Sequence, residues 1–437
     1  MRKILFILFI LFVVRTYAQT WETQNSGVMF TLRSVCFVDT LTGWVIGDSS
    51  IILQTSNGGK NWSYQTPPET YRRFTHIQFV SKSIGYIVGT NGLILSTKDG
   101  GQNWDVSPSN TDVDLWDLSF INENEGWITG SKTYTDHSIG LIIHTKDGGL
   151  TYEKQVEIIS SSQFGAKLFS AIKFQNNKVG WALAGDNVDN FSSTSVYKTE
   201  DGGLRWNSVG IINGTPSNKL AIANGDTLWC AGYSTINLAV SVDGGINWIM
   251  PSNKLSKAIA VCPKSGLVGW ISYYDFLAND KRVLYTVDLG TTWKEELKLE
   301  QTVLAMSYAD EYLWLVGTNG LIMKRFPTPT SIEYNDKATP SSFHLFQNYP
   351  NPFNNSTTIP FQLSRMSDVN LSIFNYLGQL IRSFTFSSLA SGTHLIQWDG
   401  KNNIGKHTAS GVYICKMNVK NESERNTNRF IKIIFLK

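Results

Sequence analysis

Short apolar stretches recur along the chain in a fixed order, separated by polar turns. The first stretch of each unit resembles VCFV (35–38) or IQFV (77–80), and the second centres on an aromatic residue, as in GWVIG (43–47) and GYIVG (85–89). Runs of this length, bounded by Gly, Asn and Asp, are typical of β-strands and too short for helices. The pattern therefore predicts a chain built almost entirely of short strands.

A box with the pattern Ser/Thr-x-Asp-x-Gly-x-x-Trp follows each second stretch. Its six copies are TSNGGKNW (55–62), TKDGGQNW (97–104), TKDGGLTY (145–152), TEDGGLRW (199–206), SVDGGINW (241–248) and TVDLGTTW (286–293). Their last residues lie 42, 48, 54, 42 and 45 residues apart. Four short strands in every ~45 residues describe one blade of a β-propeller.

A seventh unit is incomplete at the end of the repeats. Residues 306–325 supply three strands but no box, whereas Trp21-Glu22-Thr23-Gln24 resembles the segment that ends the first box, Trp62-Ser63-Tyr64-Gln65. We predict an all-β fold with a seven-bladed propeller over residues 19–326. Residues 21–25 should complete the last blade, which closes the ring and removes an open sheet edge.

Each box should form the turn between the third and fourth strands of its blade. The carboxylate can accept hydrogen bonds from backbone N–H groups of the turn, and the following Gly can take a positive φ. Six copies around a ring cannot all be one active site. We therefore assign a structural role to the residues at the Asp position, which are Asn57, Asp99, Asp147, Asp201, Asp243 and Asp288.

These motifs carry a family resemblance. The boxes resemble the Asp-box (BNR-type) repeats of sialidases and sortilin-type receptors. Together with the Gly-Trp-x-x-Gly strands they look most like the propellers of photosystem II assembly and stability factors and their bacterial relatives. The resemblance covers residues 21–326. It implies the fold, but a photosynthetic role does not follow from the boxes.

A second module follows the repeats. Residues 327–342 are rich in Pro, Thr and Ser and indicate a linker, and the alternating stretches of 343–437 predict a small antiparallel β-sandwich. This segment closely resembles the C-terminal sorting domain of type IX (Por) secretion cargo. The residues that carry the resemblance are Asn348, Pro350, Asn351, Pro352, Phe353, Gly378, Trp398, Gly411 and Tyr413. It implies export by the type IX machinery and, in some cargo, attachment to surface lipopolysaccharide; an accessory binding sandwich is the alternative.

The N-terminus supports export. Residues 1–18 combine a basic start, an apolar run of 11 and the small residues of a cleavage site, which together indicate a secretory signal peptide rather than a retained anchor. No other apolar run reaches 18 residues, so no internal transmembrane helix is expected. Without residues 1–18 the chain has 35 basic and 35 acidic residues, so net charge does not favour a nucleic-acid partner.

Motifs for catalysis are missing from the sequence. No His-Glu-x-x-His, Gly-x-Ser-x-Gly or Cys-x-x-Cys occurs, and His76, His137 and His144 lack metal-ligand spacing. The Phe-Arg-Ile-Pro motif of sialidases is also missing. We expect no catalytic residues, no cofactor and no metal, with a glycan-active hydrolase as the alternative. We expect the propeller Cys residues to be buried free thiols, with a disulfide between one pair as the alternative.

Loop lengths give the remaining hint of function. The second-to-third-strand segments of the third and fourth units are about seven residues longer than those of the first two. Loops on a rigid scaffold commonly bind ligands, although drift in loop length without function is the alternative. We predict that these loops and the connections before them contact an unknown protein or glycan through Tyr71, Arg72, Arg73, Trp116, Tyr134, Asp136, His137, Asn187, Asp189, Asn190 and Phe191.

Overall fold

The computed structural model consists of β-strands and turns. It describes residues 21–68, 72–161, 167–186, 193–213, 217–232, 238–250, 258–264, 268–275, 278–287, 289–290, 292–327, 343–346, 348, 351–363, 365–375, 377–390, 392–421 and 424–436. Within these ranges no helix is long and apolar enough to cross a membrane. The predicted signal peptide and nearly all of the predicted linker lie outside them.

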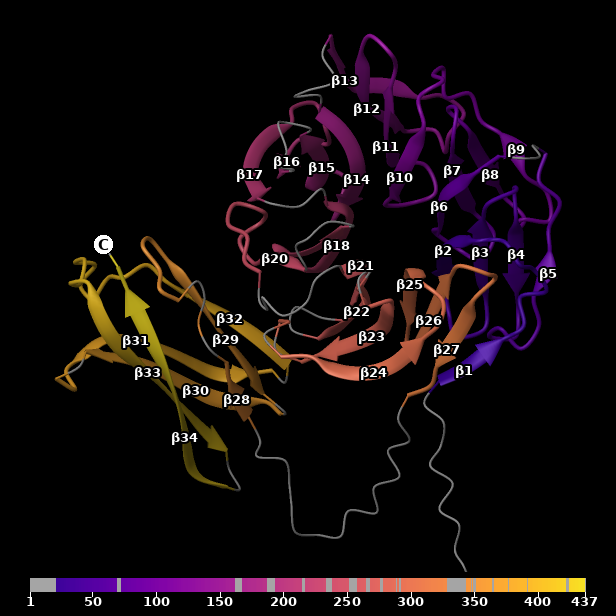
Figure 1. The fold of residues 1–437 in the computed structure, drawn as a ribbon. Coiled ribbons are helices and arrows are strands. Elements are labelled where there is room, and N and C mark those ends of the chain that lie inside the picture. The colour runs from indigo at the N-terminus through magenta and orange to yellow at the C-terminus, as the bar shows by residue number, and fades with distance from the viewer. Residues whose placement is uncertain are drawn as a thin grey trace, which may run out of the picture.

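Seven antiparallel sheets form the propeller, and Figure 1 shows them around a central axis with the first strand of each nearest that axis. Blade 1 contains β2 (Leu32–Phe37), β3 (Gly43–Gly47), β4 (Ile52–Thr55) and β5 (Ser63–Tyr64). Blade 2 contains β6 (Phe74–Phe79), β7 (Gly85–Gly89), β8 (Ile94–Thr97) and β9 (Asp105–Val106). Blade 3 contains β10 (Leu115–Phe120), β11 (Gly126–Thr133), β12 (Ser138–Thr145) and β13 (Glu153–Ser160).

The remaining blades follow the same order. Blade 4 contains β14 (Lys167–Phe174), β15 (Gly180–Asp186), β16 (Ser193–Thr199) and β17 (Asn207–Asn213). Blade 5 contains β18 (Ser217–Asn224), β19 (Thr227–Gly232) and β20 (Ala239–Ser241), and the described part of its outermost segment pairs through a bridge between Val240 and Ile249. Blade 6 contains β21 (Ala258–Pro263), β22 (Gly269–Asp275), β23 (Asp280–Thr286) and β24 (Lys294–Leu299).

Blade 7 is assembled from both ends of the propeller segment. It contains β25 (Val303–Ala309), β26 (Tyr312–Gly317), β27 (Ile322–Arg325) and β1 (Trp21–Gln24). The strand β1 pairs with β27 in antiparallel register from Trp21 opposite Arg325 to Gln24 opposite Ile322. The predicted closure by residues 21–25 is therefore confirmed, and the count of seven blades with it.

Aromatic rings pack between neighbouring blades. Trp44 of β3 stacks on Phe79 of the next blade with ring centroids 3.4 Å apart, and Trp104 of the following box meets Phe79 edge-on at 5.9 Å. The same arrangement recurs for the sets Trp314–Phe37–Trp62 and Trp127–Phe174–Trp206. The second-strand and box aromatics of the repeat are thus the core of the blade junctions, which accounts for most of the 14 Trp in the chain.

The C-terminal segment forms the two sheets of a small sandwich. One contains β28 (Phe343–Leu345), β29 (Thr357–Leu363) and β32 (Gly392–Trp398), and the other contains β31 (Leu380–Leu389), β30 (Ser367–Asn375), β33 (Gly411–Asn421) and β34 (Glu424–Phe435). Their inner faces enclose a separate apolar core that includes Phe361, Leu371 and Trp398, all fully buried. The predicted β-sandwich is confirmed.

Candidate functional site

Every first strand of the propeller carries an irregularity at the same place. In β10, for example, Leu115 pairs with Gly130 and Asp117 with Thr129, so Trp116 between them has no partner in the ladder. A β-bulge of this kind bends the strand and redirects the side chain of the extra residue. The seven residues at this position are Arg33, Thr75, Trp116, Ser170, Asn218, Ile259 and Leu304.

Six of the seven bulge side chains line one cavity at a mouth of the central channel. The cavity has a volume of about 570 Å³, and its described lining is Arg33, Arg73, Thr75, Trp116, Ser131, Leu168, Ser170, Gly185, Ser217, Asn218, Lys219 and Leu304. It lies on the side of the ring where the second-to-third-strand turns and the connections between blades are found. This is the face on which the sequence places the candidate binding residues.

Positive charge prevails at this mouth. Arg33 donates from Nε and Nη2 to the two carboxylate oxygens of Asp48 at 2.6 and 2.9 Å, and Nε of Arg73 lies 3.4 Å from the same carboxylate. Burial acts to raise the pKa of Asp48, but the two guanidinium groups outweigh it and hold that pKa below its usual value. Two arginines share one carboxylate, and no Asp or Glu belongs to the described lining of the cavity.

Trp116 lies on a strand rather than in a connection between blades, which corrects the sequence-based expectation. It occupies the bulge of β10 because two non-core residues, Trp116 and Asp117, stand between the buried Leu115 and Leu118. Its indole Nε1 donates to Ser131 Oγ at 2.9 Å, which fixes the ring at the cavity wall. Arg73 lies directly before β6.

The other sequence candidates are divided between a second cluster and segments that are not described. Tyr134 stacks on His137 at 4.5 Å in the β11–β12 turn and donates to Asp112, while His137 Nδ1 lies 2.7 Å from Asp136. None of these residues belongs to the described lining of the mouth cavity. The backbone of Arg72 hydrogen-bonds Ser50, and Tyr71, Asn187, Asp189, Asn190 and Phe191 lie outside the described residues.

The extra residues of blades 3 and 4 are built largely into strands. Those of blade 3 extend β11 and β12 to eight residues each, against five and four for the matching strands of blade 1. This lengthened hairpin carries Tyr134 and His137 at its tip and separates them from the cavity. The length of a segment between two motifs reveals an insertion, but it does not reveal whether the extra residues form a loop or lengthen the paired strands.

A cluster of titratable side chains lies deeper in the channel, in which Asp117 is buried while His76 and Lys173 are half-buried. Lys173 Nζ lies 2.9 Å from Asp117 Oδ1, His76 Nδ1 lies 3.2 Å from the same oxygen, and the backbone N–H of Ile172 donates to Oδ2. Burial, aided by the charges of Lys173 and Lys219, lowers the pKa of His76 to about 3 despite the nearby Asp117. Burial acts to raise the pKa of Asp117, but Lys173, His76 and the Ile172 N–H hold it below its usual value.

On the opposite face, the boxes form identical turns. In the second box Thr97 Oγ1 donates to Asp99 Oδ1 at 2.9 Å and accepts from Gly101 N–H, and Asp99 Oδ1 accepts from Asn103 N–H four residues on. The Thr hydroxyl and the Asp carboxylate therefore both accept backbone hydrogen bonds of the turn, whereas the sequence analysis assigned this role to the carboxylate alone. Asn57, Asp147, Asp201 and Asp243 make the matching bonds, and Asp288 lies outside the described residues.

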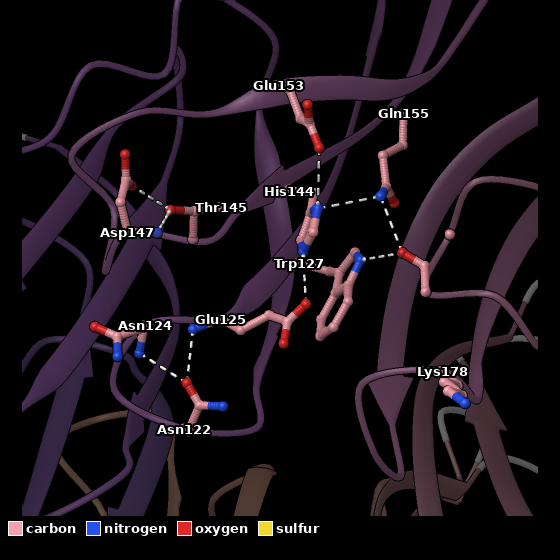
Figure 2. A network of polar contacts seen from close by, with 12 residues as sticks. Asn122, Asn124, Glu125, Trp127, His144, Thr145, Asp147, Glu153, Gln155 and Lys178 are labelled. Atoms are coloured by element: carbon pink, nitrogen blue, oxygen red, sulfur yellow. Dashed lines mark hydrogen bonds and ion pairs between the residues drawn. The ribbon is translucent and has the colours of Figure 1, made fainter.

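The box turns also tie adjacent blades together. Figure 2 shows the junction of blades 3 and 4, where Trp127 Nε1 and Gln155 Nε2 both donate to the carbonyl of Gly202 at 3.1 and 3.0 Å. His144 stacks on Trp127 at 4.5 Å, with its ring nitrogens 3.4 Å from Glu125 and 3.3 Å from Glu153. This network belongs to the packing of the ring, and a second cavity of about 570 Å³ opens beside it.

The residues that resemble a sorting motif converge on the C-terminal strand. Asn351 Nδ2 donates to Lys432 O at 2.9 Å, and Asn351 Oδ1 accepts from Ile434 N–H at 2.7 Å. Phe353 stacks on Phe435 at 4.7 Å and pairs with it in a parallel bridge. Trp398 and Tyr413 pack edge-on in the same core.

The other motif residues are spread along this segment. Asn348 is fully buried, and Pro352 follows Asn351 in a cis peptide bond. Gly378 takes a positive φ in a turn, and Gly411 begins β33. Pro350 lies outside the described residues.

The described residues offer little to a metal or a redox reaction. No group of three or more His, Cys, Asp or Glu in these ranges could hold a metal ion. All four Cys are free, so the bridge that the sequence left open is not formed. Burial raises the pKa of Cys36 to about 11 and those of Cys262 and Cys415 to about 12. Cys36 is half-buried, whereas Cys230, Cys262 and Cys415 are buried.

Comparison with known proteins agrees with the geometry. The sequence matches the family model described as photosynthesis system II assembly factor YCF48 over residues 13–108 and 67–208. It also matches that of the FlgD Ig-like domain over residues 351–423. No curated protein matches the chain.

Solved structures show the same fold at low sequence identity. YCF48 bound to D1 peptide is similar with a TM-score of 0.53 and 20% identity, over 70% of this chain and 96% of that chain. The extracellular domain of a one-component system from B. thetaiotaomicron has a TM-score of 0.51 and 12% identity, over 96% of this chain and 59% of that chain. The GH74 xyloglucanase from Xanthomonas campestris has a TM-score of 0.55 and 12% identity, over 78% of this chain and 59% of that chain. The propeller thus resembles that of the assembly factor in fold.

Proposed function

We propose that this β-propeller, similar in fold to the photosynthesis system II assembly factor YCF48, is a secreted or cell-surface module that binds a partner without catalysis. The partner contacts the mouth of the channel. One observation carries the proposal: bulges in successive blades direct six side chains, together with Arg73, into one cavity of about 570 Å³. A preformed concave site that combines apolar surface with placed polar and charged groups is typical of ligand binding. The similar YCF48 structure contains a bound peptide, which supports a protein partner.

The charge of the mouth favours binding over hydrolysis. Most glycoside hydrolases use two carboxyl groups that flank the bond that breaks, and sialidases, which use a Tyr nucleophile, also need an acidic residue. The described lining of the cavity holds two Arg and one Lys but no Asp or Glu, and the nearby Asp48 is engaged by Arg33 and Arg73. An anionic surface of a partner would complement this lining. The likeness to a xyloglucanase extends to the fold alone.

Export completes the proposal. Five residues of the sorting motif contact the C-terminal strand β34, which are Asn351, Phe353, Trp398, Gly411 and Tyr413. We expect the type IX machinery to recognise the strand in this packed form. The signal peptide would take the chain into the periplasm, and lipopolysaccharide attachment would retain it at the outer surface. Similarity to an extracellular propeller domain supports this location.

The binding proposal is tested by affinity capture from outer-membrane extracts with the tagged full chain. We expect a partner that the double variant Arg73→Ala, Trp116→Ala no longer captures, while Leu150→Ala, an exposed change on the opposite face, leaves capture intact. Capture of the same partner by the wild type, by the double variant and by Leu150→Ala would contradict a site at the mouth. Turnover of any substrate in a glycosidase screen would contradict the non-catalytic role.

The export proposal is tested in a bacterium that has type IX secretion. We expect the full chain to reach the cell surface and a chain ending at residue 342 to stay in the periplasm, both measured by protease shaving and fractionation. Surface display of the shortened chain would overturn the proposed role of residues 343–437.

A further inference from the structure

A ring of equivalent residues lies one position beyond the bulges. These residues are Ser34, His76, Asp117, Ala171, Lys219, Ala260 and Ala305. Five of them line a channel cavity of about 500 Å³ below the mouth. Because the seven positions share one register, their side chains can be compared directly.

Most polar members of the ring are committed to the structure. Ser34 Oγ accepts a hydrogen bond from the backbone N–H of Ile77 in the next blade, at 3.4 Å. Asp117 accepts from the backbone N–H of Ile172 and pairs with Lys173, and His76 lies against the same carboxylate. These contacts join first strands around the channel, so packing explains why these three residues are polar.

Lys219 has no such explanation. Within the described part of the chain its ammonium makes no hydrogen bond and no ion pair, and its ring neighbours Ala171 and Ala260 offer no polar side-chain atom. Burial lowers the pKa of Lys219; the negative charge of Asp117 opposes this shift, and the positive charges of Lys173 and Arg33 add to it. Lys219 is half-buried and its side chain lines the open channel, where packing gives no reason for a charge that the neighbouring alanines lack.

The position of Lys219 suggests what would pair with it. Lys219 lines both the mouth cavity and the channel cavity below, so it lies where the two meet. An entering group passes the apolar side chains of Trp116, Leu168 and Leu304 before it reaches the ammonium. A carboxylate on a partly apolar chain fits this order of contacts, because it would place a negative charge in direct contact with the ammonium.

We propose that Lys219 binds a carboxylate group that the partner inserts through the mouth of the channel. This rests on the proposed function, since it names the chemistry that the same site recognises. The carboxylate belongs either to an acidic side chain or to a chain terminus, and both present the same charged group to the ammonium.

The test follows Lys219 directly. The full chain is reductively methylated with ¹³C-formaldehyde, and the Lys219 methyl resonance is assigned from its loss in Lys219→Met. Acetate, inorganic phosphate and two peptides are then titrated, one with an internal Glu and an amidated end, the other without acidic side chains and with a free end. We expect a saturable shift of this resonance with acetate and with at least one peptide, which identifies the source of the carboxylate.

Affinity is then compared among variants by calorimetry with the peptide that shifts the resonance. Removing one partner of a desolvated charge pair should weaken binding about thirtyfold or more in Lys219→Met. Lys219→Arg should retain much of the affinity, and Lys98→Met, on the opposite face, should equal the wild type. No shift with acetate, a shift with phosphate alone, or equal affinity of Lys219→Met would overturn the proposal. If Arg73 and Trp116 variants lose the partner while Lys219→Met keeps it, this inference fails and the proposed function stands.

Discussion

Closure of the ring by β1 makes a quantitative prediction for Trp21. Trp21 is 3% exposed and packs against Trp270, Leu315 and Met323 in the core between blades 6 and 7. Burying about 200 Å² of an indole at ~25 cal/mol per Å² corresponds to about 5 kcal/mol. The indole Nε1 is buried without a hydrogen-bond partner, which offsets about 1–3 kcal/mol of that gain. We therefore expect Trp21→Ala to lower the free energy of unfolding of blade 7 by about 3 kcal/mol.

Amide hydrogen exchange is the suitable measurement, because it reports local opening strand by strand. In Trp21→Ala the amides of β27, which pairs with β1, should exchange faster by about two orders of magnitude, since 1.36 kcal/mol corresponds to tenfold. Trp21→Phe removes the unpaired N–H and keeps most of the packing, so it should lie within about 1 kcal/mol of the wild type.

The matched control for Trp21 is an aromatic on an outer strand that does not close the ring. Tyr64 on β5 is 55% exposed, so Tyr64→Ala should change the free energy of unfolding by less than about 0.5 kcal/mol. Unchanged exchange at β27 in Trp21→Ala would refute the argument that β1 holds the ring closed.

Three further predictions test other features. Hydrogen bonds from Thr151 lower the pKa of Asp147 to about 2, below the unfolded value near 3.8. The carboxylate therefore stabilises the fold fully above pH 4, and this stabilisation is lost as the pH falls towards 2. Asp147→Asn should flatten this part of the acid-unfolding curve, because Asn57 forms the same turn without titrating. Leu289 has a φ of 61° at a position where the other boxes have Gly. In denaturant unfolding, Leu289→Gly should therefore be more stable than Leu289→Ala by about 1 kcal/mol. The reverse order would contradict backbone strain at this residue. Asn351→Ala should raise hydrogen exchange at Ile434 at least tenfold, because about 1–3 kcal/mol of hydrogen bonding to β34 is lost; protection equal to wild type would exclude this contact as an anchor.

The repeat made most of the propeller predictable. Box spacing and the aromatic second strands placed the blades, and the likeness of Trp21–Gln24 to Trp62–Gln65 located the closing strand. These features are local or repeated, so one chain contains several independent copies of each signal.

The site was predicted less well, for a physical reason. Arg73 and Trp116 were identified and do line the cavity, but Lys219, Arg33 and Asn218 were missed. The available signal is a pair of non-core residues between two core positions, as in Leu115-Trp116-Asp117-Leu118, where strict alternation would allow one. Which bulges meet across the channel depends on ring closure, and contacts between residues this far apart in sequence leave no local pattern.

The seven bulges also bear on how such a ring could acquire new specificities. A bulged residue has no partner in its ladder, so exchanging its side chain leaves the strand pairing of its own sheet intact. Thr75 and Ser170 also hydrogen-bond carbonyls of the next blade through their hydroxyls, so their side chains help to hold the ring. Asn218, whose Oδ1 has no hydrogen-bond partner, is the natural place to graft a new side chain and redirect the propeller towards a chosen target.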